Sequence, residues 1–176
     1  LEEISNNNFI TKTVKYSFFD RLYQYEYDGN QPSSLKGTIV IRFNKERMNI
    51  PLMNSRGFQA GLLNDFVDNS TLTAMHSKTG IDWSRNRTYK VFKNMIVADS
   101  LSVTRLGDTI RTDDLWTFLS VDIADSYNIS DICDSLKTLT EFITEADKDI
   151  LYHSNSITTD QFFLSGQFVL YPNYIY

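Results

Sequence analysis

The stretch LKGTIVIRFNK, residues 35–45, decides the fold because its apolar residues alternate with polar ones. Alternation at every second position is typical of a β-strand that buries one face. One face of this stretch would carry Leu35, Gly37, Ile39, Ile41 and Phe43. We therefore predict a strand here. Similar alternation in FITKTVKYSFF, residues 9–19, and LYQYEY, residues 22–27, predicts two strands before it.

Further strands are indicated by the same period later in the chain. They are expected in RTYKVFKNMIVADSLSVT (87–104), DDLWTFLSVDIADS (113–126) and DQFFLSGQFVLYPNYIY (160–176). Apolar spacings of three and four predict helices in NSRGFQAGLLNDFVDN (54–69) and NISDICDSLKTLTEFITEADKDI (128–150). The intervening DNSTLTAMHSKTGIDWSRN (68–86) has no clear period and is expected to be a long loop.

Because strands mostly follow strands, the sequence predicts an α+β fold with a largely antiparallel sheet and two helices packed on one face. The length of 176 residues suits one domain. We assign that domain to residues 9–176 and interpret residues 1–8 as a flexible N-terminal segment. The aromatic fraction of 14%, mostly Phe and Tyr, also favours sheet structure.

The charge and cysteine content exclude some classes of protein. The net charge of −5 comes with no basic run longer than two residues, so we expect no nucleic-acid partner. No apolar run of about 18 residues predicts a membrane span, and LEEISNNN lacks the pattern of a signal peptide, so we expect a soluble chain. The single cysteine, Cys133, allows no internal disulfide, and the compartment stays open.

Residues 102–112, SVTRLGDTIRT, read as a β-hairpin with a type II′ turn at Gly107-Asp108. This turn would place Arg105 opposite Ile110 and Val103 on the same face as both. Neither face is apolar enough to be core, so we expect the hairpin to project into solvent.

Some residues of the sequence are of types that can bind ligands or take part in catalysis. The histidines, His76 and His153, form no ligand motif with Cys133, and glycine-rich phosphate loops are absent from the sequence, so no cofactor is predicted. One alternative is a metal-dependent hydrolase or nuclease that uses clustered carboxylates such as Asp113, Asp114 and Asp122. Another is a sugar- or peptide-binding domain with a tyrosine-rich face formed by Tyr23, Tyr25 and Tyr27.

The sequence favours a non-catalytic structural or interaction module that assembles with other protein subunits, further copies of itself included. Subunits of virions, phage tails and bacterial surfaces have comparable architectures, which is an analogy of architecture alone. Pro172 is followed by an apolar chain end that a partner would cover. The predicted partner-binding residues are Val103, Arg105, Leu106, Ile110, Arg111, Tyr174, Ile175 and Tyr176.

Overall fold

The computed structural model describes residues 11–15, 20–28, 31–103, 105–111 and 113–150. The predicted N-terminal segment 1–8, the predicted strand from residue 160 and the partner-binding residues Tyr174, Ile175 and Tyr176 lie outside these ranges.

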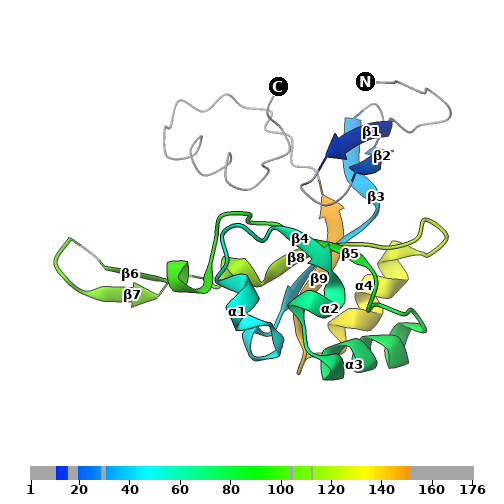
Figure 1. The fold of residues 1–176 in the computed structure, drawn as a ribbon. Coiled ribbons are helices and arrows are strands. Elements are labelled where there is room, and N and C mark those ends of the chain that lie inside the picture. Colours follow the sequence, from blue (N-terminus) through cyan, green and yellow to red (C-terminus); the bar gives the residue numbers. More distant parts are fainter. Residues whose placement is uncertain (1–10, 16–19, 29–30, 104, 112, 151–176) are drawn as a thin grey trace.

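Strand β3 (Gln31–Phe43) is the centre of a seven-stranded sheet with the order β1-β2-β3-β8-β5-β4, and β9 also pairs with β3 (Figure 1). Every pairing in this sheet is antiparallel. The other strands are β1 (Thr11–Lys15), β2 (Asp20–Asp28), β4 (Ala60–Leu62), β5 (Arg87–Lys90), β8 (Phe118–Asp122) and β9 (Ile143–Ile150). The prediction of an α+β fold with an antiparallel sheet is therefore confirmed.

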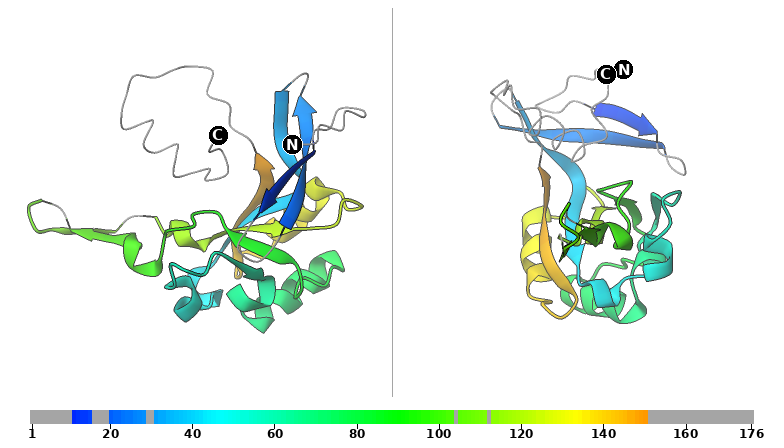
Figure 2. Two further views of the ribbon diagram at one scale, coloured as in Figure 1. Left: turned by 45° about the horizontal axis from the view of Figure 1, so that its top comes forward. Right: turned by 90° about the vertical axis from the view of Figure 1, so that its left-hand side faces the viewer.

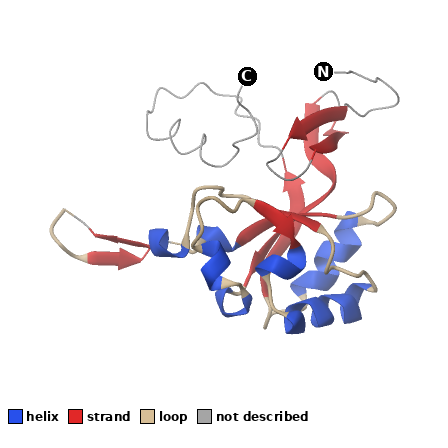
Figure 3. Ribbon diagram, in the orientation of Figure 1, coloured by secondary structure: helices blue, strands red, loops and turns tan. Residues whose placement is uncertain are grey.

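Helices follow β3, β4 and β8 along the chain and are drawn in blue in Figure 3. The described residues contain α1 (Ile50–Met53), α2 (Leu63–Phe66), α3 (Asn69–Thr79) and α4 (Ile129–Lys137), and 3₁₀ turns η1 (Lys45–Arg47), η2 (Val97–Ser100) and η3 (Leu115–Thr117). Strands β3, β5, β8 and β9 with α3 and α4 follow the order β-α-β-β-α-β, and their order in the sheet is β9-β3-β8-β5. This is the ferredoxin-like, or split β-α-β, arrangement.

The alternation that predicted β3 is also what builds the core. Ile39 and Ile41 have no exposed surface, and Phe43 is buried beside them. In register with them, Leu119 and Val121 of β8 face the same way. The same cluster takes in Leu72 and Met75 of α3 and Ile132, Cys133 and Leu136 of α4. Helices and sheet therefore share one apolar core.

Gly37 bends β3 at the point where it changes partners. The strand pairs with β2 up to Leu35 and with β8 from Thr38 onward. Gly37 has a φ of 69° between them, and its carbonyl accepts from the Ile123 amide at 2.9 Å. A Cβ here would collide with the Asp125 carboxylate and lie 3.1 Å from the Ile123 carbonyl oxygen. Only glycine meets both constraints without strain.

The helix predicted over residues 54–69 is wrong. The segment holds β4 and α2, and α1 precedes it. Gly61 explains the difference, because a Cβ there would meet the Phe58 ring at 2.7 Å and the Asp65 carboxylate at 2.9 Å. The Asp65 carboxylate accepts from the Leu62 amide at 2.8 Å, so the chain folds back tightly around this glycine.

The loop predicted over residues 68–86 is also wrong, because it contains α3. Asp68 caps this helix by accepting from the Thr71 amide at 2.8 Å, and Gly80 ends it with a φ of 71°. The helix escaped detection because its buried face is short and includes Thr71 beside Leu72 and Met75. Prediction of a single helix over 128–150 fails at its far end, where residues 143–150 pair with β3 as β9.

We predict that Gly37→Ala destabilises the protein by about 2–3 kcal/mol, because it combines left-handed backbone strain with overpacking. Gly80→Ala is the matched control, since its φ of 71° is similar but no atom lies within 4 Å of the added Cβ. It should cost about 1–2 kcal/mol, the strain alone. Urea unfolding of both variants measures this, and equal losses would show that the close approach at Gly37 is unimportant.

Candidate interaction arm

The hairpin predicted from the sequence is present and projects from the body of the molecule (Figures 1 and 2). It consists of β6 (Leu101–Val103) and β7 (Thr109–Arg111), which form a two-stranded sheet separate from the main one. We call residues 101–111 the arm. It occupies the connection between β5 and β8, two strands that lie side by side.

The arm exposes its apolar side chains to an unusual degree. The exposed fractions are 59% for Leu101, 70% for Val103, 89% for Leu106 and 48% for Ile110. The other large apolar side chains that are exposed within the described residues are Ile50, Tyr127 and Ile150, which come from separate elements. Single exposed apolar residues are ordinary, whereas a group of four on one projection is unusual for a protein surface.

The register of the arm differs from the prediction. Val103 pairs with Thr109 and Ser102 with Ile110, so the chain reverses between Val103 and Thr109 rather than at Gly107-Asp108 alone. Leu101 and Val103 therefore share one face, and Ile110 lies on the opposite face. The two-residue turn was wrong because Gly107, with a φ of 89°, sits inside a longer loop. Both faces consequently present apolar groups.

Polar contacts close the root of the arm, where the chain enters and leaves it. The Trp116 indole N–H donates to the Ser100 hydroxyl at 2.9 Å and lies 3.3 Å from the Asp114 carboxylate. Trp116 is buried, at 2% exposure, so this contact joins the arm's two ends beside the core. We call Ser100, Asp114 and Trp116, with the contacts that join them, the arm root. These contacts hold the two ends of the arm beside the core.

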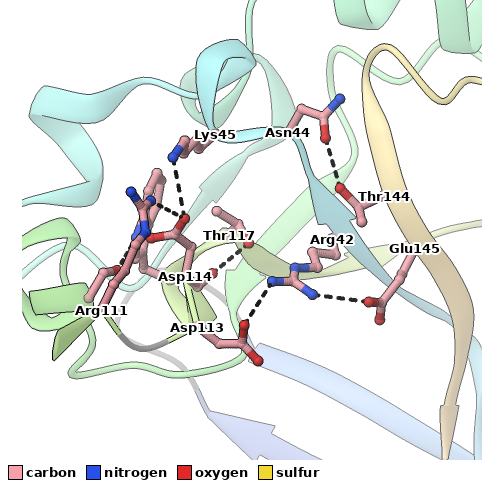
Figure 4. A network of polar contacts seen from close by, with 11 residues as sticks. Arg42, Asn44, Lys45, Arg111, Asp113, Asp114, Thr117, Thr144 and Glu145 are labelled. Atoms are coloured by element: carbon pink, nitrogen blue, oxygen red, sulfur yellow. Dashed lines mark hydrogen bonds and ion pairs between the residues drawn. The ribbon is translucent and has the colours of Figure 1, made fainter.

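Asp114 is the central acceptor of the arm root (Figure 4). Its carboxylate accepts from the Arg111 guanidinium at 2.8 Å, and the Lys45 ammonium lies 3.7 Å away. Burial acts to raise the pKa of Asp114, but hydrogen bonds from Ser100, Arg111 and Trp116 and the Arg111 charge outweigh it, so the pKa is lowered. The carboxylate thus stays ionised and holds the last residue of β7.

Arg42 connects the arm root to the sheet. Its guanidinium lies 3.8 Å from Asp113 and donates to Glu145 of β9 at 3.1 Å (Figure 4). It also stands 5.1 Å from the centre of the Phe118 ring. Cations from β3 and η1 thus face both acids that follow the arm. Because these partners are distant in the sequence, no local pattern indicates that they meet.

The predicted carboxylate set does not converge. Asp113 and Asp114 face cations at the arm root, and Asp122 lies on β8 opposite Thr38. Within the described ranges, no group of three or more His, Cys, Asp or Glu side chains could hold a metal ion. His76 lies 3.0 Å from the Ile81 carbonyl oxygen, and His153 is outside those ranges. The described carboxylates therefore do not gather into the metal site that this alternative requires.

Cys133 is buried in α4 as part of the core. Burial, followed by the charge of Asp147, raises the pKa of the thiol to about 11. A thiol with this pKa is protonated at neutral pH and is a poor nucleophile. The side chain acts as a small apolar group.

Lys90 is a buried cation that no pattern in the sequence predicts. Its side chain, 2% exposed, lies on the core face of β5 and donates to the Met53 and Ser55 carbonyl oxygens, each at 3.1 Å. Burial and the nearby charge of Arg56 lower its pKa. Because both acceptors are backbone groups, Lys90 fastens the end of α1 to the sheet.

The tyrosine-rich face was predicted to bind a sugar or peptide. Tyr25 and Tyr27 are half-buried on β2, and the side chain of Tyr23 lies outside the described set. Neither tyrosine stands as exposed as the apolar residues of the arm. The arm is therefore the surface on which the described part of the chain most resembles a contact site.

Comparison of the chain with protein-family models, with curated proteins and with solved structures finds no match. In the described residues, no helix has both the length and the apolar character needed to cross a membrane.

We expect Asp114→Asn to loosen the arm root, because it removes the charge that Arg111 and Lys45 face. The expected loss is about 1.5 kcal/mol of local stability, at the low end for a hydrogen bond to a charged group because the Arg111 side chain is 57% exposed. Amide hydrogen exchange in residues 101–103 and 109–111 should become about tenfold faster. Asp113→Asn is the control, since that side chain is 79% exposed and should change exchange little. Equal effects would refute the special role of Asp114.

Cys133 should resist thiol reagents in the folded protein, because the thiol is both buried and protonated. We expect labelling by a disulfide reagent at pH 8 to be at least about a hundredfold slower than in denaturant. The chain has one cysteine, so the absorbance change reports this site alone. Fast labelling of the native protein would contradict the assignment.

Proposed function

We propose that the chain is a non-catalytic interaction module that assembles with other protein subunits through the arm. The observation that carries the proposal is the group of four exposed apolar side chains, Leu101, Val103, Leu106 and Ile110, on one projection. Removing apolar surface from water is worth about 25 cal/mol per Å², so a partner that covers the arm gains directly.

The stability of the arm supports the same proposal. Three residue pairs join β6 to β7, and an isolated two-stranded hairpin is at best marginally stable in water. The arm root fixes where the arm begins, but it does not cover the strands. A partner that packs on both faces would supply the missing contacts. Both strands also have an outer edge that can pair with another strand.

Charge favours a second copy of the chain as the subunit that is bound. The arm carries Arg105 and Arg111, whereas the whole chain has a net charge of −5. Glu145 and Asp147 are exposed on β9, at the far edge of the sheet from β4. With Asp108 included, the two arginines leave the arm a net charge of +1 on an acidic chain. Arg111 pairs with Asp114, so Arg105 is the arginine of the arm that can meet an acidic surface, and opposite charges steer such surfaces together.

Sedimentation of the full chain over a range of concentrations tests the proposal. We expect the wild type to form oligomers, and the triple variant Leu101→Ser, Val103→Ser, Leu106→Ser to shift the association midpoint at least about tenfold to higher concentration. Tyr127→Ser is the matched control, because Tyr127 is 44% exposed outside the arm.

A chain that stays monomeric at every concentration would overturn assembly through a second copy. Oligomers that form equally well with the triple variant would overturn the role of the arm. Salt should weaken the association, since Arg105 and acidic groups would be screened.

A further inference from the structure

We propose that the peptide bond between Arg105 and Leu106 is a processing site for a trypsin-like protease, one that cleaves after arginine. This inference concerns the arm in a free subunit and does not rest on the proposed function. The class of enzyme follows from the side chain before the bond, because trypsin-like proteases bind an arginine or lysine in an acidic pocket.

The first support is the position of the bond. Arg105 and Leu106 lie in the turn between β6 and β7, at the point of the arm farthest along the chain from its root. Leu106 is 89% exposed, the largest exposed fraction among the exposed large apolar side chains described. Exposed loop tips are the preferred places for proteolytic nicking, because a protease must wrap its cleft around the substrate.

The second support is the absence of restraint. Among the described residues, Arg105 makes no hydrogen bond or ion pair, and no backbone hydrogen bond outside the ladders involves residues 105–107. A protease binds its substrate in an extended form, so a site that needs no unfolding is cut first. The Arg105 guanidinium is free to enter an acidic pocket.

Other basic residues on the surface are held in place. Arg111 donates to Asp114 at 2.8 Å, and Arg56 donates to Asp99 at 2.9 Å. Arg85 is exposed in a turn, but the residue after it, Asn86, donates to the Asp122 carbonyl oxygen at 2.7 Å. These three arginines are the ones compared with Arg105, and each is held directly or through the next residue.

The reaction is a hydrolysis that consumes one water molecule. The bond between the Arg105 carbonyl carbon and the Leu106 nitrogen breaks. The hydroxyl of water becomes part of the new Arg105 carboxylate, and its hydrogen goes to the new Leu106 amine. No other reactant is required.

Cleavage would divide the arm but not the body. Residues 1–105 carry β3 and β5, and residues 106–176 carry β8, α4 and β9. The ladders of β3 with β8 and with β9 cross between the two pieces. The two pieces therefore stay together through the core, whereas β6 and β7 lose the turn that joins them. The site acts as a switch on the arm alone.

Limited digestion of the full chain tests this, with trypsin as the probe and protein dilute enough to have the mass of one chain. We expect a first product of two fragments, 1–105 and 106–176, whose masses sum to that of the chain plus one water. They should separate in denaturant and elute together in native size-exclusion chromatography. Arg105→Gln should slow the first cut at least about tenfold, because the next site needs local unfolding.

Arg85→Gln is the matched control, since it removes an exposed arginine from a held turn and should leave the first cut unchanged. The proposal is overturned if the first cut falls at another bond, or if Arg105→Gln leaves its rate unchanged. Fragments that separate under native conditions would overturn the switch. Arg105 is exposed and makes no hydrogen bond or ion pair among the described residues, so its variant is expected to fold.

Discussion

The pairing of β3 on both sides holds this molecule together. Ile39, Val40, Ile41 and Arg42 each face a partner on β8 and another on β9. These partners come from parts of the chain that are about 80 to 110 residues farther along, so closing the sheet fixes the whole topology at once. Ile39 and Ile41 are fully buried in the core that β3 shares with α4, and this burial stabilises the paired strands.

The face of β3 that points away from the core carries charged contacts. Arg42 alternates with Ile41, so its guanidinium emerges on the face opposite the core and reaches both Asp113 and Glu145. The arm root is therefore tied to the most restrained strand of the protein. The arm has little stability of its own, but the core holds its root in place. A fixed root lowers the conformational entropy that the arm would lose if it bound a partner.

Sequence reasoning succeeded where one local pattern dominates. Strict alternation located β3, and the exposed mixture of residues around Gly107 identified a projecting hairpin. It failed where two weak signals compete. The apolar spacing before residue 143 fits a helix and continues into residues 143–150, but this segment forms β9. Pairing with β3 leaves Ile143 and Ala146 almost completely buried. The contacts of Arg42 and Lys90 depend on residues far away along the chain, and no local pattern encodes such meetings.

The closed root has a consequence for how this protein can diverge. Ser100 and Trp116 are hydrogen-bonded across the arm's base, and the Val91 amide donates to the Phe118 carbonyl oxygen at 3.2 Å just below. The two ends of the arm therefore meet at the same place beside the sheet, whatever residues lie between them. The sheet therefore depends little on the length and composition of the segment between Ser100 and Trp116, because a surface connection whose ends are fixed tolerates changes of sequence.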